Sequence, residues 1–376
     1  MMTGTPENKK PKIPDRAVVI AALLILLALG LIALFSPGGN FSEWERRELA
    51  DRPAAPDFLH WNTDKALEGF LKDHIPGRRM LVAADSAFQF LTGRGSRLNT
   101  WYVNGALVEL PVPADSRALE TKLRRFERLA GDVPWVLLTP KTHGWLRRNQ
   151  MIPSMAACYD TEAEAYAILE SCGNAVAMPE AFNENPDEMY YHTDHHWTLQ
   201  GAWQAYQALG KRLGYEPLPM EAFKLTEYGG FRGTTLSRSG LPALWQDTLR
   251  CAEPDSPVTL TMPDRSGETE ENRLIFPEDA ATYDGYAVYL HGNHGVLVIE
   301  RPDAPEGTLV VFKDSFANCL LPLLSRHYRR IIAADARYGS GLFSDVLSRS
   351  DDTKAILFLY SLDSLVNDSE ITKWAK

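Results

Sequence analysis

Residues Thr308-Leu309-Val310-Val311-Phe312-Lys313-Asp314-Ser315 decide the fold class of this chain. The apolar run, rich in β-branched residues, predicts a strand that is buried on both faces. The strand stops at Ser315, where a helical pattern begins. Similar runs follow at 331–334 and 355–360, separated by helical patterns. Buried strands that alternate with helices predict an α/β fold in which helices cover both faces of a parallel sheet.

The same alternation extends toward the N-terminus. Apolar side chains recur at helical spacing in 118–129 and 161–169, and short apolar strands are expected at 134–139 and 175–178. Thr198 is suited to cap a helix that Gly214 closes. A less regular insertion occupies about 215–305. The sheet is therefore expected to gather strands from both sides of an insertion.

A hairpin and two helices precede this region. Asn104-Gly105 lies at the centre of a hairpin expected at 101–108. Apolar spacing in 64–91 predicts two helices, with a break at Ile75-Pro76-Gly77. The charged residues around this break are expected on a solvated helix face and turn; they are Asp73, His74, Arg78 and Arg79.

Composition limits the possible partners. The chain has 376 residues, of which 45% are hydrophobic, and a formal net charge of -10. Nucleic acid is excluded as a partner, because phosphate binding needs a clustered Lys/Arg surface that this acidic sequence lacks. Four cysteines are too few for a disulfide scaffold. Cys158 and Cys172 are close enough in sequence to close a short loop, and their spacing alone leaves open whether they pair.

The N-terminus predicts a membrane anchor. Residues 17–35 carry no charge and nearly match a ~30 Å hydrocarbon core, and Lys9, Lys10, Lys12 and Arg16 precede them. The positive-inside rule then places 1–16 in the cytoplasm and everything after residue 40 outside. A long signal peptide is the alternative and gives the same compartment. The expected organisation is a tail at 1–16, an anchor at 17–35, a tether with helices at 36–100 and an α/β domain at 101–376.

Ser315 is the candidate nucleophile, because reactive groups of parallel sheets lie where strands end. A serine there is also a good helix N-cap, which is the structural alternative. A serine hydroxyl needs a base and an acidic residue that orients the base. Asp194 and His196 fit these roles, since residues i and i+2 of an extended segment project to the same side. His195 is then expected to point away, as a structural residue.

A metal site is the second possibility. His192, Asp194 and His196 alternate and could supply three ligands to zinc or manganese, with His291 or His294 completing the shell. His143 is a weaker candidate for a ligand or a base. The serine hypothesis ranks first, so no metal and no cofactor is expected.

Thr193-Asp194-His195-His196-Trp197 resembles the bacterial DHHW family, which is named for these letters. Further blocks that look like this family begin at Phe231, Gly292, Lys313 and Asp335, and another, Asp73-His-Ile-Pro-Gly-Arg78, lies near the anchor. The family is similar to SGNH-hydrolase-like proteins that O-acetylate alginate and other exported polysaccharides. The resemblance therefore implies an SGNH-hydrolase-like sheet.

The resemblance also implies roles for individual residues. Asp194 would orient, His196 would act as base and Ser315 would carry an acetyl group as an ester. His195 and Trp197 are expected beside the site as structural residues. Lys313-Asp314-Ser315 replaces the usual Gly-Asp-Ser, and the oxyanion donors would be Ser315 N–H with Asn293 or Asn318. Contacts to sugar or acyl group would come from Arg337 and Tyr338.

The resulting functional hypothesis is a membrane-anchored O-acetyltransferase that acts outside the cytoplasmic membrane. Its acceptor would be an exported or cell-surface polysaccharide, and an integral membrane acyltransferase would supply the acetyl group. Two alternatives remain: a carbohydrate acetylesterase with the same three residues, and a non-catalytic assembly or glycan-binding protein of an exopolysaccharide complex.

Overall fold

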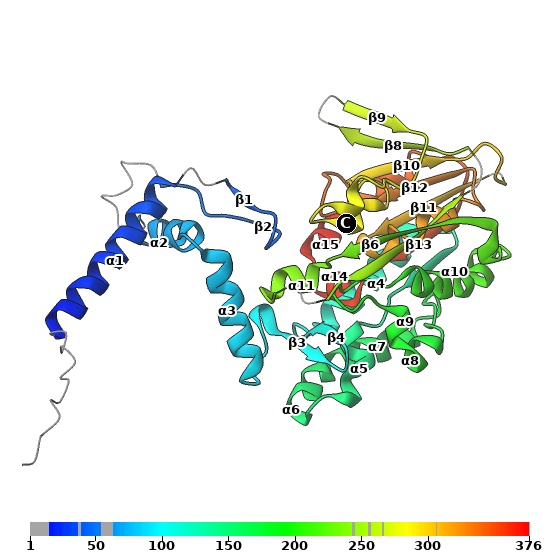
Figure 1. Ribbon diagram of the computed structural model, residues 1–376. Coiled ribbons are helices and arrows are strands. Elements are labelled where there is room, and N and C mark those ends of the chain that lie inside the picture. The colour runs from blue at the N-terminus through cyan, green and yellow to red at the C-terminus, as the bar shows by residue number, and fades with distance from the viewer. Residues whose placement is uncertain are drawn as a thin grey trace, which may run out of the picture. The chain divides into compact units, whose positions relative to one another are not determined.

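The computed structural model describes residues 15–36, 39–53, 63–242, 245–254, 257–264, 267–305 and 307–375 (Figure 1). The chain divides after Asp85 into two compact units. The expected cytoplasmic tail lies almost entirely outside the described residues, as do Pro37 and Gly38 after the first helix. Each unit is described by itself below.

The N-terminal unit begins with one long apolar helix, α1 (Asp15–Phe35). Its segment Arg16–Phe35 has a mean hydropathy of 3.2 and is long enough to cross a membrane. Most of its large apolar side chains are exposed; Leu26, for example, is 64% exposed. Length and composition are thus compatible with a single-pass anchor or a signal sequence.

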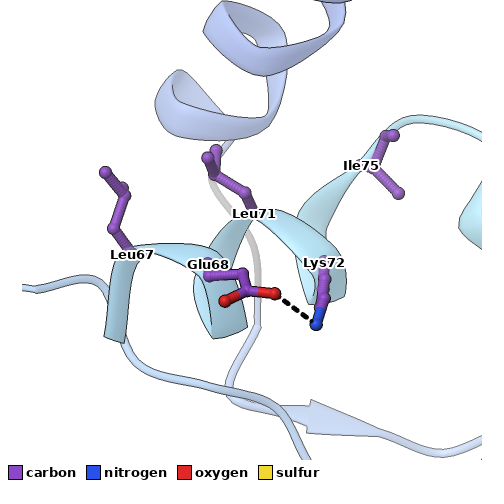
Figure 2. Close-up of a pocket in the computed structure, with 5 residues that line it drawn as sticks. All are labelled: Leu67, Glu68, Leu71, Lys72 and Ile75. Carbon is purple, nitrogen blue, oxygen red and sulfur yellow. Dashed lines mark ion pairs between the residues drawn. The ribbon is translucent and has the colours of Figure 1, made fainter. Parts of the chain in front are cut away.

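Two short strands, β1 (Phe41–Ser42) and β2 (Arg47–Glu48), pair antiparallel after α1. Helices α2 (Thr63–His74) and α3 (Arg78–Leu91) follow, with the expected break between them. On α2 a shallow hollow is lined by Leu67, Leu71 and Ile75, beside an ion pair between Glu68 and Lys72 (Figure 2). Both helices expected in 64–91 are confirmed.

The expected solvated face at this break is wrong for Asp73 and Arg78. Arg47 binds the Asp73 carboxylate through both terminal nitrogens, at 3.0 and 2.5 Å, and Ala50 N donates to the same group at 2.9 Å. Arg78 reaches Glu45 and Asp73 at 3.0 and 3.4 Å. The hydrogen bond from Arg47 lowers the pKa of Asp73 to about 2. Asp73 and Arg78 are partly buried at these helix ends, because residues distant in sequence supply opposite charges to them.

The C-terminal unit is built on a seven-stranded sheet of order β5-β13-β11-β12-β10-β8-β9. Four neighbouring strands run parallel, which confirms the expectation for this part: β5 (Trp135–Leu138), β13 (Thr353–Leu359), β11 (Thr308–Lys313) and β12 (Arg330–Ala334). The other three strands extend the sheet antiparallel. They are β10 (Val296–Glu300), β8 (Thr259–Asp264) and β9 (Gly267–Glu271). The sheet is mixed because these strands come from the insertion, where short connections favour antiparallel pairing.

Alternation along the central strands divides the core in two. Val311 and Leu357 face one apolar cluster, and Val310 and Phe358 face the other. Residues i and i+2 share a face in a strand, so continuous apolar runs supply both sides. Helix α10 (Leu199–Leu213) belongs to the first cluster, whereas α4 (Ser116–Ala130) and α7 (Asp160–Ser171) belong to the second.

The remaining elements frame this sheet. The hairpin is confirmed as β3 (Thr100–Val103) and β4 (Ala106–Glu109), and a second antiparallel ribbon consists of β6 (Phe223–Phe231) and β7 (Asp247–Pro254). Short helices complete the unit: α5 (His143–Arg147), α6 (Pro153–Ala156), α8 (Ala181–Glu184), α9 (Pro186–Met189), α11 (Thr234–Ser239), α12 (Leu321–Leu324), α13 (Phe343–Leu347), α14 (Leu362–Asn367) and α15 (Ser369–Trp374).

Local predictions had mixed outcomes. Thr198 Oγ1 accepts from Gly201 N, and Gly214 ends α10 with a φ of 77°, as expected. The strand at 175–178 is wrong, because only Ala175 bridges Leu137 there. The helix expected after Ser315 is broken into a 3-10 turn and α12. All four cysteines are free, so Cys158 and Cys172 are not bridged.

Leu357→Ala should lower the free energy of unfolding by about 2–5 kcal/mol, since Leu357 lies on the central strand β13 and its side chain is fully buried in the first apolar cluster. Leu225→Ala is the control, because Leu225 on β6 is 45% exposed; its effect should stay within about 0.5 kcal/mol. Urea unfolding of the full chain in detergent measures both. Equal destabilisation by the two variants would contradict the buried position of Leu357.

Candidate active site

The carboxyl end of β11 presents Ser315. Asp314 immediately precedes it and holds the turn, since its carboxylate accepts from Phe316 N at 3.0 Å and from Ser361 N at 2.7 Å. Asp314 is therefore the N-cap of the 3-10 turn at Ser315–Ala317, in place of Ser315. The capping role considered for Ser315 is taken by its neighbour, and the Ser315 hydroxyl is left for another partner.

That partner is His196. His196 Nε2 lies 2.7 Å from Ser315 Oγ, and His196 Nδ1 lies 2.6 Å from Asp194 Oδ1. The three side chains thus form a continuous hydrogen-bonded chain, in the geometry that passes a proton from a hydroxyl to an imidazole held by a carboxylate. Sequence reasoning brought together the same three residues across 119 positions.

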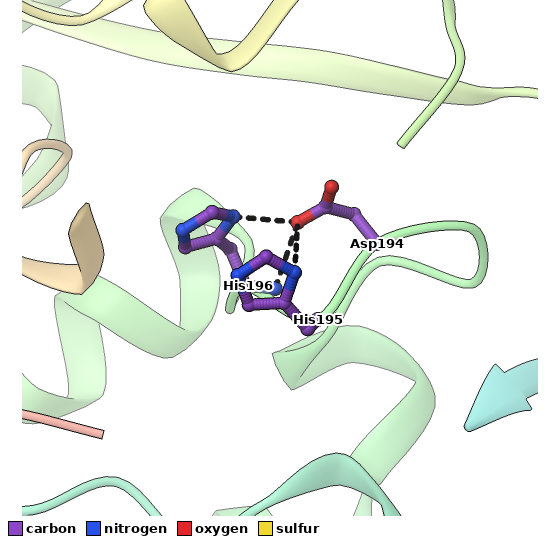
Figure 3. Close-up of side chains that lie close together, drawn as sticks. All are labelled: Asp194, His195 and His196. Carbon is purple, nitrogen blue, oxygen red and sulfur yellow. Dashed lines mark hydrogen bonds and ion pairs between the residues drawn. The ribbon is translucent and has the colours of Figure 1, made fainter. Parts of the chain in front are cut away.

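The expected direction of His195 is wrong. Its Nδ1 lies 3.7 Å from Asp194 Oδ1 and its ring is 4.0 Å from that of His196, so both imidazoles lie on the side of the carboxylate (Figure 3). The side chain is 41% exposed. Residues 192–196 form a bend that an isolated bridge between Tyr190 and Trp197 closes. The strand rule of alternating sides does not apply to a bend.

Asp194 is completely buried, and its carboxylate is satisfied by three hydrogen bonds. His196 donates to Oδ1 through both its backbone N, at 2.9 Å, and Nδ1, and Thr234 N donates to Oδ2 at 2.5 Å. Burial by itself would raise the pKa of Asp194, but the charges of His196 and His195 and these hydrogen bonds hold it well below its ordinary value. Asp194 is therefore ionised and oriented toward His196.

A second carboxylate, which sequence reasoning missed, holds the backbone before Asp194. Asp247, the first residue of β7, accepts from His192 N at 3.1 Å, Thr193 N at 2.8 Å and Thr193 Oγ1 at 2.6 Å. Thr193 Oγ1 also accepts from Gly233 N at 3.0 Å. No spacing signal links Asp247 to the motif, because the two are 54 residues apart.

Gly233 has no room for a side chain. A Cβ at this position would lie 2.3 Å from both Asp194 Cβ and Thr193 O. The close approach lets the Thr234 N–H reach the buried carboxylate of Asp194. Gly233 falls within the block at 231–240 that resembles the DHHW family, which is the sequence signal that could have found it.

Two aromatic rings fix the imidazole and the turn. Tyr286, from the insertion, stacks on His196 with ring centroids 3.9 Å apart and an interplanar angle of 5°. Trp197 is fully buried and donates through Nε1 to Phe316 O at 3.0 Å. Trp197 therefore ties the histidine bend to the serine turn. Tyr286 was not among the sequence candidates, since nothing in its surroundings marks it.

Behind Ser315 lies a buried polar network. Lys313 Nζ donates to Asn318 Oδ1 at 2.7 Å, and Asn318 Nδ2 donates to Gly292 O at 3.3 Å and to Asn293 Oδ1 at 3.1 Å. Burial lowers the pKa of Lys313. The side chain of Asn318 is thus engaged at both ends, and it orients the amide of Asn293.

Arg337 donates to the buried carboxylate of Asp335 through Nε at 2.9 Å and a terminal nitrogen at 2.7 Å, and its side chain is 32% exposed. Tyr338 is 55% exposed, and its ring lies 5.4 Å from the Arg337 guanidinium carbon. The expected roles of these two residues in substrate contact stay predictions.

The other histidines considered from the sequence lie outside this cluster. His192 contacts Asp247 and Asp187, each at 3.2 Å, and His291 contacts Asp279 at 2.7 Å. His294 Nε2 lies 3.0 Å from Leu290 O. His143 is buried and accepts from Arg147 Nε at 2.7 Å, and burial lowers its pKa well below the ordinary range. The proposed His192-Asp194-His196 ligand set is therefore wrong for His192.

Within the described ranges, one group has three atoms close enough to hold a metal ion: Asp194, His195 and His196, all within 4.8 Å. Both ring nitrogens of His196 are already hydrogen bonded, one to Asp194 and one to Ser315. A metal ligand needs a free lone pair on a nitrogen, so this arrangement favours proton transfer over metal binding.

A model described as DHHW protein matches residues 173–333. The resemblance to the DHHW family is confirmed. The matched residues 173–333 include Asp194, His196 and Ser315. No curated protein matches the chain.

Several solved structures have a fold similar to that of most of this chain. A DHHW family protein from Eubacterium siraeum is 19% identical, with a TM-score of 0.60 over 74% of this chain and 98% of that chain. Bacillus cereus PatB1 with a sulfonyl adduct is 22% identical, with the same TM-score and coverage. A second PatB1 structure is 22% identical with a TM-score of 0.60, over 72% of this chain and 98% of that chain. The similarity shows a common mixed α/β fold.

Gly233→Ala should lower the free energy of unfolding by about 1–3 kcal/mol, because the new methyl group overlaps Asp194 and Thr193. Gly229→Ala is the matched control, since a Cβ there meets nothing within 4 Å. Thermal or urea unfolding of both full-length variants tests this. If Gly233→Ala were as stable as Gly229→Ala, the close approach would be incorrect.

Asp194 should contribute stability that depends on pH. The pKa of Asp194 in the folded protein is below its unfolded value of about 3.9. The stabilisation by the ionised carboxylate is therefore fully present above about pH 3.9, and it is lost as the pH falls from there toward the folded pKa. The difference in unfolding free energy between wild type and Asp194→Asn should therefore narrow from pH 6 to about pH 3. Exposed Asp132→Asn serves as control, and a difference that widens on acidification would oppose the assignment.

Proposed function

We propose that the chain is an SGNH-hydrolase-like O-acyltransferase that moves an acetyl group to a polysaccharide through an acyl-enzyme at Ser315. The observation that carries the proposal is the unbroken hydrogen-bond chain from Asp194 through His196 to Ser315. The DHHW resemblance supports the acetyl group and the glycan acceptor. The shared fold of PatB1, whose structure carries a sulfonyl adduct, supports the fold assignment.

The acylation step transfers the acetyl group from the donor to the Ser315 hydroxyl. Ser315 Oγ attacks the carbonyl carbon of the acetyl donor while His196 Nε2 takes the hydroxyl proton. The carbonyl electrons move to oxygen and then return, which breaks the bond to the donor oxygen. His196 gives the proton to that leaving oxygen, and an acetyl ester remains on Ser315. Asp194 holds His196 in the tautomer that can accept the proton.

The acceptor reverses these steps. A sugar hydroxyl loses its proton to His196 and attacks the ester, and the proton returns to Ser315 Oγ. The backbone N–H of Ser315 and the amide of Asn293 are the proposed donors to the oxyanion. Asn293 suits this role because Asn318 holds its Oδ1, whereas the side chain of Asn318 is already occupied.

The donor and the location are parts of the proposal. Acetyl-CoA is a cytoplasmic compound, so an acyl carrier within the membrane, such as an integral acyltransferase, would deliver the acetyl group outside. The apolar helix α1 would act as a single-pass anchor with the C-terminal unit in the periplasm or outside the cell. The exposed apolar side chains of α1 and its basic N-terminal flank support this orientation.

Full-length protein in detergent should form an acetyl adduct with p-nitrophenyl acetate, detected by intact-mass analysis and mapped to Ser315. Ser315→Ala should lose the adduct, and Asp194→Asn should slow its formation by at least about 10³-fold. Ser344→Ala, an exposed serine on α13, is the matched control and should react normally. An adduct that survives Ser315→Ala would overturn the mechanism.

Transfer to a sugar and hydrolysis by water are separated by the fate of this adduct. Faster loss of the adduct on addition of an oligosaccharide, with acetylated oligosaccharide as product, supports a transferase. Loss that is independent of any sugar supports the esterase alternative.

A further inference from the structure

A pocket of about 500 Å³ lies beside the bend that carries Asp194. Its lining comes from four parts of the C-terminal unit: the end of α3, the β3–β4 hairpin, His192 of the bend, and residues 245–247 at the entry to β7. A volume of ~300–1,000 Å³ is typical of sites for small organic ligands. The pocket is separate from the contacts among Asp194, His196 and Ser315 described above.

Three aromatic residues form one side of this pocket. The rings of Phe90 and Tyr102 lie 6.1 Å apart, and those of Tyr102 and Trp245 lie 5.8 Å apart, both edge to face. Tyr102 keeps 47% of its surface exposed. A sugar ring has apolar faces of C–H groups that pack on such aromatic surfaces, so this wall fits a carbohydrate.

Polar groups complete the pocket. Gln246 is exposed and offers both a donor and an acceptor, and the side chain of His192 is 39% exposed. Sugar hydroxyls need donors and acceptors of this kind around the edge of the ring. An aromatic wall with a few convergent polar groups is the usual composition of a specific ligand site.

The charges around the pocket favour an uncharged chain. Its lining includes the carboxylate of Asp247, and none of the described residues that line it is a lysine or an arginine. Asp187, which is 54% exposed, lies 3.2 Å from His192 Nε2. Asp187 is also ion-paired with Arg147, so Asp247 is the anionic side chain of the lining itself. Anionic chains such as polyuronates need cationic partners, and Asp247 would repel them.

The pocket shares its wall with the catalytic bend. Asp247 accepts from the backbone of both His192 and Thr193, and Leu107 N of the β3–β4 hairpin donates to His192 O at 2.8 Å. Thr193 directly precedes Asp194. A ligand in this pocket therefore contacts His192 and Asp247, which hold the backbone just before Asp194 in place.

We propose that this pocket is an acceptor subsite that binds an uncharged oligosaccharide, with Trp245 and Tyr102 stacking on its rings and Gln246 and His192 binding its hydroxyls. As an acceptor subsite it rests on the proposed function. It goes further by naming where the glycan binds and by excluding a polyuronate as the preferred acceptor.

Direct binding tests the subsite. Full-length Ser315→Ala protein in detergent, which cannot turn the ligand over, is titrated by calorimetry with cellohexaose, chitohexaose and a mannuronate hexasaccharide. At least one neutral hexasaccharide should bind, and the mannuronate should bind at least about tenfold more weakly. Trp245→Ala added to this background should weaken the neutral ligand at least about tenfold, and Trp245→Phe should restore most of the loss. Tyr283→Ala, a 40% exposed aromatic outside the pocket, should change nothing.

Gln246→Ala is a second pocket variant, which should fold normally because the Gln246 side chain is exposed. It should weaken binding of the neutral hexasaccharide about threefold. Equal or tighter binding of the mannuronate would overturn the proposal. So would neutral binding that persists in Trp245→Ala, or that is lost instead in Tyr338→Ala. Failure of all three probes to bind would also overturn it.

Acylation distinguishes this proposal from the proposed function. Trp245→Ala with Ser315 intact should form the acetyl adduct at nearly the wild-type rate, since a small ester does not need the pocket, while transfer to the neutral hexasaccharide falls at least about tenfold. Neutral binding that depends on Trp245, without any adduct in wild type, would retain the glycan site and reject the acyltransferase. An adduct at Ser315 with no Trp245-dependent binding would retain the acyltransferase and reject the glycan site.

Discussion

The buried charge of Asp194 is the constraint on which the site depends. A carboxylate without solvent contact is unfavourable unless donors surround it. Here the donors come from separate segments, the His196 backbone and ring and the Thr234 N–H of α11. Their convergence requires a bend at 192–196 and a glycine at position 233. The conformation of the DHHW bend is thus a consequence of satisfying one charge, and His196 is aimed at Ser315 as a result.

A second, separate carboxylate plays a supporting part. Asp247 holds the backbone of His192 and Thr193, and Trp197 joins the other end of the bend to the turn after β11. The bend is therefore fixed before and after Asp194. Such support matters because a serine–histidine hydrogen bond is useful only when the imidazole stays in place as the proton moves.

The sequence predicted those features whose signal is local or strongly periodic. The parallel strands, the Thr198 cap and the Gly214 end follow from apolar runs and from capping chemistry. Residues Asp194, His196 and Ser315 were found because few side chains suit proton transfer. Asp247 and Tyr286 were missed because their roles arise only from tertiary contacts. The prediction that His195 points away was wrong, since the chain bends around the buried Asp194 carboxylate. The prediction that Asp73 lies on a solvated face was wrong because its partner Arg47 is distant in sequence.

The β6–β7 ribbon has a further consequence for how such proteins diversify. It belongs to the insertion, outside the parallel strands, yet the segments at its ends carry Gly233, Gln246 and Asp247. The described residues of 231–247 therefore combine the support of the Asp194 carboxylate with part of the neighbouring pocket wall. Evolution can exchange the residues at 245–246 without altering β11, the strand that precedes Ser315. The pocket wall at 245–246 is thus separable from β11, whereas Asp247 and Gly233 also hold the backbone around Asp194 and must be retained.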